Sequence, residues 1–192
     1  MKMVPLALIL SIAAAASAPA CDQPVTFTSS QIEGRLSTLA SGAVGPLEKV
    51  TAFRELACSD DDAVRLMAEE AALRAGGQAL RASLLKSILF DREVLILQPY
   101  DDGSLTDEQR AFIEDNPVIR LPFTSKDNAN SCIGTHGNDC RTGNVLDISG
   151  TGVAVSHSGS VGELVLNDAG LLEGTWVPDR SSVRVPVRAR LR

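Results

Sequence analysis

The spacing of apolar residues divides the chain into a helical half followed by a strand half. Between residues 29 and 90, apolar side chains recur every three or four residues, which is the period of an amphipathic α-helix. Ser30 and Glu33 form the pattern of a capping box, and Pro46 suits the first turn of a helix. Four helices are therefore predicted, from Ser30 to about Ala40, from Pro46 through Leu56, from Asp62 to the Gly76–Gly77 pair, and from about Gln78 to Leu89.

One segment of the helical half carries a family resemblance. Asp62 is followed by Val64-Arg65 and then by the small residue Ala68. Together with the helix before it, this order resembles a HEAT-type repeat over residues 47–73. The resemblance implies a style of helix packing, with a concave interaction surface, and implies no chemistry. Because such repeats stack in groups of at least about three and one clear copy is found here, an ordinary helical bundle is the alternative.

After Asp91 the hydrophobic pattern changes to that of strands. The continuous apolar run 94–97 predicts a strand buried on both faces, and Thr106 with Gln109 predicts the cap of a short helix. From Asn144 onward, alternating apolar residues separated by turn residues predict an antiparallel meander with one face in water. The predicted fold class is α+β. A helical bundle at 21–91 is followed by a mostly β region at 92–192.

The last predicted strand carries apolar residues on one face and four arginines on the other, Arg184, Arg188, Arg190 and Arg192. A row of like charges creates a local positive field, so this basic face is a candidate site for anionic headgroups, peptidoglycan or an acidic partner. The favoured interpretation is an edge strand that charge and Pro186 protect from edge-to-edge pairing. A neighbouring strand with acidic residues opposite the arginines is another explanation.

The N-terminus has the composition of a secretory signal peptide. Lys2 supplies a positive charge, residues 4–16 are mostly apolar, and small residues follow up to Ala20. The apolar run is too short to span a bilayer, and no later segment approaches about 18 consecutive apolar residues. We therefore predict that residues 1–20 are a signal peptide, and that the mature protein is periplasmic or secreted and not transmembrane.

Removal of the signal peptide would place Cys21 at the new N-terminus. The sequence Ala18-Pro19-Ala20-Cys21 resembles a bacterial lipoprotein box, in which the cysteine is acylated, although Ala18 stands where such boxes usually carry Leu. The alternative is a disulfide with Cys58. Acylation would leave Cys58 as a lone thiol in an oxidising compartment, so the disulfide is favoured.

The other two cysteines, Cys132 and Cys140, bracket a polar segment rich in turn residues. In an exported protein this arrangement favours a disulfide that closes the loop 132–140. A loop held in this way is a candidate recognition element, with Thr135, His136, Asn138 and Asp139 as its contact residues. The alternatives are free or intermolecular thiols, and a zinc site of Cys132, His136, Asp139 and Cys140, although this spacing fits no common zinc motif.

Candidate catalytic residues are few, because the sequence contains only two histidines, His136 and His157. His157 is flanked by serines, but adjacent side chains along a strand point to opposite faces and no Gly-x-Ser-x-Gly elbow is present. We interpret His157 as a solvated residue at a strand end. The acidic clusters at 60–62 and 101–102 suit a helix terminus and a turn better than a pair of glycosidase carboxylates. No catalytic or metal residue and no cofactor is predicted.

The formal net charge of −6 argues against nucleic acid as the main partner, since phosphate binding requires an excess of Lys and Arg. These features together predict an exported, bacterial-type envelope protein with a non-catalytic binding or interaction role. The predicted partner is a protein, glycan or lipid of the cell envelope. The alternative is a periplasmic hydrolase that uses carboxylates and a histidine in a cleft between the two halves.

Overall fold

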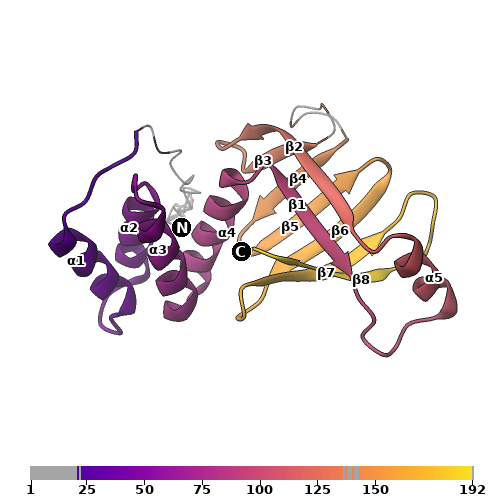
Figure 1. Cartoon of the computed structure of the whole chain (residues 1–192), viewed down its shortest axis with the longest axis horizontal. Helices are drawn as coiled ribbons and strands as arrows, with labels where there is room; N and C mark the ends of the chain where they lie inside the picture. The colour runs from indigo at the N-terminus through magenta and orange to yellow at the C-terminus, as the bar shows by residue number, and fades with distance from the viewer. Residues whose placement is uncertain (1–20, 22, 136, 138–139, 141–142, 192) are drawn as a thin grey trace, which may run out of the picture.

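The protein combines a group of helices with a β-barrel beside it, and a short helix lies at the far end of the barrel (Figure 1). The structure is a computed structural model that describes residues 21, 23–135, 137, 140 and 143–191. The predicted signal peptide (1–20) lies outside the described residues. So do His136, Asn138 and Asp139 of the predicted loop and Arg192 of the predicted basic face.

The helical part confirms the four predicted helices. They are α1 (Ser29–Ala40), α2 (Pro46–Ala57), α3 (Asp62–Ala75) and α4 (Gln78–Asp91). The prediction that Ser30 and Glu33 cap α1 is wrong, because Thr28 and Gln31 form that capping box: the Gln31 amide carbonyl accepts from the backbone N–H of Thr28 at 2.9 Å. Both pairs fit the same pattern, and the earlier pair gives the helix additional residues at its N-terminus.

The C-terminal part is a closed barrel of eight antiparallel strands in which every strand pairs with the next along the chain. The strands are β1 (Val94–Pro99), β2 (Ile119–Asp127), β3 (Cys132–Thr135), β4 (Val145–Ser149), β5 (Gly152–His157), β6 (Ser160–Leu166), β7 (Leu171–Val177) and β8 (Val185–Arg190). The helix α5 (Asp107–Asp115) lies between β1 and β2 in the chain, and Thr106 and Gln109 cap it as predicted. The predicted meander is therefore present, and pairing of β1 with β8 closes it.

Closure of the barrel corrects two expectations. The prediction that residues 94–97 are buried on both faces is wrong: Leu95 and Leu97 face the interior, whereas Ile96 is 38% exposed on the outside. The interpretation of the last strand as an edge is also wrong, because β8 pairs with β7 on one side and with β1 on the other. A closed barrel has solvent outside and no free edge, so each strand needs only one apolar face.

Helix α4 lies between the other helices and one end of the barrel (Figure 1). Its side chains are buried on most of its surface, including Leu80, Leu84, Leu85 and Leu89. Polar bonds fix its contact with the barrel: Arg81 donates to the carbonyl oxygen of Leu166 at 2.8 Å. Because α4 contributes to both sides, the buried side chains of the helices and of the barrel form one continuous core.

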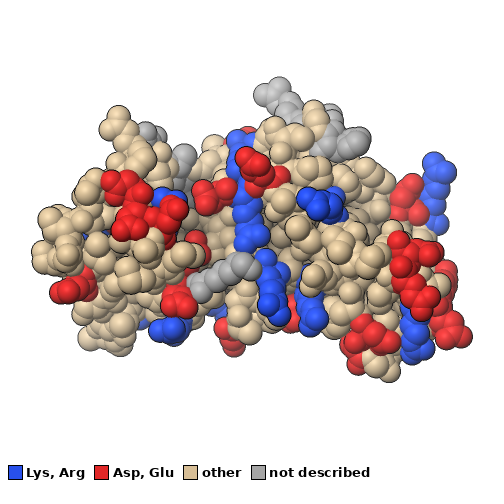
Figure 2. Space-filling view, in the orientation of Figure 1, with Lys and Arg blue, Asp and Glu red and all other residues tan. Residues whose placement is uncertain are grey.

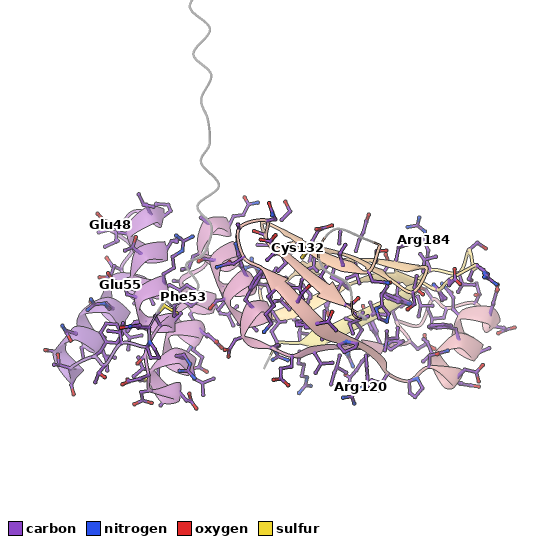
Figure 3. The ribbon with its side chains drawn as sticks, turned by 90° about the horizontal axis from the view of Figure 1, so that it is seen from above. Glu48, Phe53, Glu55, Arg120, Cys132 and Arg184 are labelled. Carbon is purple, nitrogen blue, oxygen red and sulfur yellow. A yellow bond between two sulfur atoms is a disulfide. The ribbon has the colours of Figure 1, made fainter. Side chains whose placement is uncertain are left out.

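The short helix α5 lies at the opposite end of the barrel, as the view from above also shows (Figure 3). The side-chain amide of Gln109 donates to the backbone carbonyl of Arg184 at 2.5 Å, and Phe112 packs against the core. An eight-stranded barrel is just wide enough for side chains to fill. The two ends are thus distinct, with α4 at one and α5 at the other.

Gly174 provides a test of the barrel geometry. A Cβ atom at this position would clash with the carbonyl oxygen of Glu163 and lie 2.8 Å from the Cα atom of Leu164 in the paired strand β6. We expect Gly174→Ala to lower the free energy of unfolding by about 3 kcal/mol, because backbone atoms must move to admit the methyl group.

The matched control is Gly34→Ala in α1, where a Cβ atom meets nothing within 4 Å. This substitution should stabilise the protein by about 0.5–1 kcal/mol, because alanine has the higher helix propensity. Urea denaturation measures both changes. If Gly174→Ala were as stable as the parent protein, the close contact between β7 and the backbone of β6 at this position would be contradicted.

Candidate functional site

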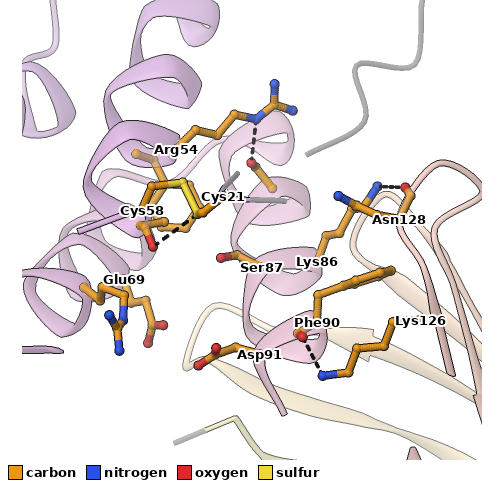
Figure 4. Close-up of a pocket in the computed structure, with 14 residues that line it drawn as sticks. Cys21, Arg54, Cys58, Glu69, Lys86, Ser87, Phe90, Asp91, Lys126 and Asn128 are labelled. Carbon is orange, nitrogen blue, oxygen red and sulfur yellow. Dashed lines mark hydrogen bonds between the residues drawn. A yellow bond between two sulfur atoms is a disulfide. The ribbon is translucent and has the colours of Figure 1, made fainter. Parts of the chain in front are cut away.

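A cavity of about 380 Å³ lies where the helical part meets the barrel. Its wall is formed by α2, α3 and α4, by the turn between β2 and β3, and by the Cys21–Cys58 disulfide (Figure 4). The charged side chains that line it are Arg54, Arg65, Glu69, Lys86, Asp91 and Lys126. We call this space the junction cavity. Its volume is at the lower end of the range for small-molecule sites.

One face of α4 supplies much of the wall. Ser83, Lys86, Ser87 and Phe90 are spaced by three and four residues, so they share a face of the helix, and all four line the junction cavity. Asp91, at the C-terminal end of α4, also lines the junction cavity and is exposed. Helix α4 therefore contributes hydroxyl groups, an ammonium group, an aromatic ring and a carboxylate to the wall of the cavity.

Lys86 is the most buried charged side chain in this wall, with 7% of its surface exposed. Its Nζ atom donates to the backbone carbonyl of Asn128 at 2.7 Å and to Oγ of Ser131 at 2.9 Å, and lies 5.5 Å from the centre of the Phe90 ring. Burial lowers the pKa of Lys86, and the positive charge of Arg54 lowers it further, while Asp127 acts in the opposite direction.

Arg54 and Lys126 add positive charge around Lys86. Nε of Arg54 donates to Oγ of Ser83 at 3.3 Å, which holds the guanidinium over α4, and Nζ of Lys126 donates to the backbone carbonyl of Phe90 at 2.7 Å. These cations come from α2, α4 and β2, so they meet only in the folded chain. On the surface, Lys and Arg side chains gather in a band over the junction of α4 and the barrel, with acidic side chains beside it (Figure 2).

The Cys21–Cys58 disulfide predicted from the sequence is present and forms another part of the wall. Beyond it, the N-terminal arm is held by a short bridge in which Val25 N–H donates to the Cys58 carbonyl at 2.8 Å and Asp60 N–H donates to the Val25 carbonyl at 3.1 Å. The disulfide joins residues 37 apart, and a loop of this length corresponds to about 4 kcal/mol of stabilisation on the chain-entropy account.

The second predicted disulfide, Cys132–Cys140, is also present. Within the predicted recognition loop, however, Thr135 is fully buried on β3 and is not available to a ligand. His157 is half-buried, and its Nδ1 atom lies 2.9 Å from Oγ1 of Thr135. The interpretation of His157 as a solvated residue is therefore wrong, because alternation along β5 places it on the interior face with Val153 and Val155.

Three of the four arginines of the predicted basic face lie within the described residues. Arg184, Arg188 and Arg190 are exposed on the outside of the barrel, as the alternation predicted, and Arg184 lies toward the α5 end (Figure 3). Arg188 is opposite Glu173 in the register of β7 and β8, and its guanidinium lies 5.0 Å from the centre of the Tyr100 ring. For Arg188, the explanation that a neighbouring strand places an acidic residue opposite the arginine is therefore confirmed.

The junction cavity was not predicted from the sequence. The available signal was Lys86, a charged residue next to Leu85 and near Ile88 and Leu89 in a helix whose neighbouring positions are apolar. A lysine in such a position must be paired or must face a polar space. The residues that surround it come from distant parts of the chain, so their convergence depends on the fold.

Comparison of the chain with protein-family models, curated proteins and solved structures finds no match. The residues described in the structure contain no helix with the length and apolar character needed to cross a membrane. Within the same residues, no group of three or more His, Cys, Asp or Glu side chains is arranged to hold a metal ion.

The lowered pKa of Lys86 predicts a pH dependence of stability. In the unfolded chain this lysine titrates near its ordinary value of 10.5, so between the two pKa values the unfolded state binds more protons than the native state. The contribution of Lys86 to the free energy of unfolding should therefore rise as the pH increases toward 10.5. Lys86→Met removes this titration, and its stability relative to the parent protein should fall over the same interval.

Denaturant unfolding of both proteins from about pH 7 to about pH 10.5 measures this difference. Arg54→Leu serves as a second variant, because removing the Arg54 charge should raise the pKa of Lys86 and reduce the slope. A stability difference between Lys86→Met and the parent protein that stays constant with pH would contradict the assignment.

Proposed function

We propose that this chain is an exported, non-catalytic binding protein that holds a small organic anion in the junction cavity. The observation that carries the proposal is the convergence of Arg54 and Lys86, two like charges from different helices, on one partly enclosed space. Each cation makes the other less favourable. An anion bound between them relieves this repulsion and gains charge-assisted hydrogen bonds.

The rest of the wall supports an organic rather than an inorganic anion. Phe53, Phe90 and Ala57 line the junction cavity beside the charges, so a ligand with an apolar body buries surface there. Small-molecule sites commonly combine such an apolar lining with a few polar groups that fix orientation. We therefore expect an aromatic or aliphatic carboxylate or phosphate ester to bind better than inorganic phosphate.

A binding role fits this wall better than hydrolysis. Its two cysteine sulfurs are joined in a disulfide and supply no thiolate, and Nζ of Lys86 already donates to two oxygen atoms. His157 ends β5 and pairs with Thr135 on the interior side of the barrel, and it is not among the residues that line the junction cavity. Within the described part of the chain, no histidine lines the junction cavity beside the carboxylates Glu69 and Asp91, so the wall gives the hydrolase alternative no support.

Export to the periplasm or the cell exterior is part of the proposal. Two disulfides join all four cysteines, which is the usual state in an oxidising compartment and rare in a reducing one. Acylation of Cys21 would need the sulfur atom that is bonded to Cys58, so the lipid-anchored form and the disulfide form exclude each other. We propose the disulfide form.

Intact mass of the protein from the producing cells tests the export proposal. We expect a chain that begins at Cys21, with a mass lower than the reduced form by the hydrogens lost in forming two disulfides. A chain that keeps residues 1–20, or whose thiols all react with an alkylating reagent without prior reduction, would contradict export. An increase of hundreds of daltons together with recovery in the membrane fraction would identify the lipid-anchored form instead.

Calorimetric titration at constant ionic strength tests the anion site. The probes are benzoate and phenyl phosphate, with benzylamine as a cation of similar shape. Benzoate and phenyl phosphate should bind and benzylamine should not, and Lys86→Met should weaken anion binding by about tenfold, because a buried charge-assisted hydrogen bond is lost.

Arg120→Met is the matched control. It removes the same charge from an exposed position on the outside of the barrel, away from the junction (Figure 3). Affinity for benzoate should be unchanged in this variant. Equal binding by the parent protein and Lys86→Met, or equal losses in Lys86→Met and Arg120→Met, would contradict an anion site in the junction cavity.

A further inference from the structure

The outside of the barrel is divided by charge. On β4, β6 and β7 the charged residues at outward positions are all acidic, namely Asp147, Glu163 and Glu173. On β2 and β8 the charged residues at outward positions are all basic, namely Arg120, Lys126, Arg188 and Arg190. Strand β1 pairs with both β2 and β8, so these basic positions lie on adjacent strands. We call the outer surface of β8, β1 and β2 the cationic face; the exposed Asp91 and Glu93 precede it in the chain.

An apolar side chain lies among these cations. Ile96 on β1 is directly opposite Arg120 on β2, and Gln98, the next outward residue of β1, is opposite Arg188 on β8. Opposite residues of an antiparallel pair have Cβ atoms about 5 Å apart. Figure 2 shows basic side chains over β1 and β2 on this side of the barrel. The cationic face therefore combines positive charge with an isoleucine that is 38% exposed.

The arginines of the cationic face lack the ion pairs that other arginines make. Six arginines elsewhere pair with a carboxylate, namely Arg35, Arg65, Arg74, Arg81, Arg110 and Arg180. Among the described residues, no carboxylate forms an ion pair with Arg120, Arg188 or Arg190. Glu173 is opposite Arg188 in the register, but its carboxylate accepts a hydrogen bond from Nδ2 of Asn167 at 2.7 Å. The positive charge of this face is thus left largely uncompensated by the strands around it.

Protection of a sheet edge does not explain these charges. Charged residues on an edge strand prevent pairing with another chain, but β8 is paired with β7 on one side and with β1 on the other. The arginines therefore need another explanation. A positive surface on a chain whose net charge is −6 attracts an anionic partner to one side of the molecule and fixes the orientation of the encounter.

The shape of the cationic face favours a broad partner over a small ligand. Ile96, Arg120 and Arg188 are on the outside of a barrel and line neither the junction cavity nor the hollows beside α1 and at the start of α4. Small ligands are usually held in concave sites. An anionic lipid surface presents many phosphates side by side to the arginines, and its boundary between headgroups and acyl chains accepts an exposed apolar side chain such as Ile96.

We propose that the cationic face docks this protein peripherally on an anionic phospholipid surface. Arg120, Arg188 and Arg190 pair with headgroup phosphates, and Ile96 enters the boundary between headgroups and acyl chains. The interaction goes beyond the proposed binding of a small anion and does not depend on it, because the residues that carry it are outside the junction cavity.

Sedimentation with lipid vesicles tests the proposal on the disulfide-bonded protein. The probes are phosphatidylcholine vesicles containing phosphatidylglycerol and vesicles of phosphatidylcholine alone. The protein should bind the anionic vesicles at least about tenfold more tightly, because each arginine near an anionic surface contributes about fivefold to the affinity. Raising the ionic strength from about 0.05 M to about 0.5 M should release most of the bound protein, because salt screens exposed charges.

Two double variants assign the binding to the cationic face. Arg120→Gln combined with Arg188→Gln should weaken binding to the anionic vesicles about thirtyfold. The matched control combines Arg74→Gln with Arg180→Gln, which changes the net charge equally at exposed positions in α3 and after β7, and should alter binding less than about twofold. Ile96→Thr should weaken binding about threefold, because less apolar surface is buried. Urea denaturation verifies that each variant is folded.

Several results would overturn the proposal. These are equal binding to the two kinds of vesicle, equal losses in the two double variants, or capture of the protein by soluble polyglutamate without binding to vesicles, which would identify an acidic chain as the partner. The comparison of lipids and the salt dependence use the parent protein, so they decide the question even where a variant is unstable.

Lys86→Met separates this inference from the anion site. It should weaken benzoate binding and leave vesicle binding unchanged, whereas Arg120→Gln with Arg188→Gln should do the reverse. Vesicle binding by a protein that does not bind benzoate or phenyl phosphate would support the cationic face and contradict the anion site. A loss of vesicle binding in Lys86→Met as large as in the arginine double variant would place lipid binding at the junction cavity and overturn the assignment to the cationic face.

Discussion

Burial of α4 on two sides is the constraint on which the rest of the molecule depends. Most surface helices need one apolar stripe, but α4 contacts the helices on one side and the barrel on the other. Leu80, Leu84, Leu85 and Leu89 together join the two cores, each of which would otherwise expose an apolar surface. The position of the junction cavity follows directly, because it occupies the margin of this contact.

The same contact explains why a lysine is buried in α4. Lys86 bridges to the turn between β2 and β3 through Asn128 and Ser131, so its hydrogen bonds fix the helix against the barrel. The cost of this arrangement is the desolvation of an ammonium close to Arg54. The fold thus holds Arg54 close enough to Lys86 to favour the neutral form of the lysine, and Asp127 offsets part of this effect.

Local patterns were sufficient to predict the helices and most of the strands. The three-to-four-residue spacing located α1 to α4, and the two-residue alternation placed Arg184, Arg188 and Arg190 on the outside of the last strand. Both cysteine pairs were predicted from the even count and from the expectation of an oxidising compartment. These features depend on residues that are near one another in the sequence, or on a pairing with few alternatives.

Apart from the capping box of α1, which Thr28 and Gln31 form, the errors concern contacts between distant residues. Closure of the barrel depends on pairs such as Pro99 with Val187, for which no short segment carries a signal, so the solvent-exposed position of Ile96 was missed. The pairing of His157 with Thr135 likewise joins two strands that are not neighbours in the sheet. The junction cavity needs α2, α4 and β2 in place at once, and its one local signal, Lys86 among buried leucines, did not show which residues would surround it.

The pairing of the first strand with the last also has a consequence for how the chain matures. The residues that join β1 to β8 are about 90 positions apart, so their contact can form only after all the strands between them have been made. Until β8 is added, β1 and β7 each keep an unpaired edge. Addition of this strand is therefore the step that closes the barrel and removes both edges.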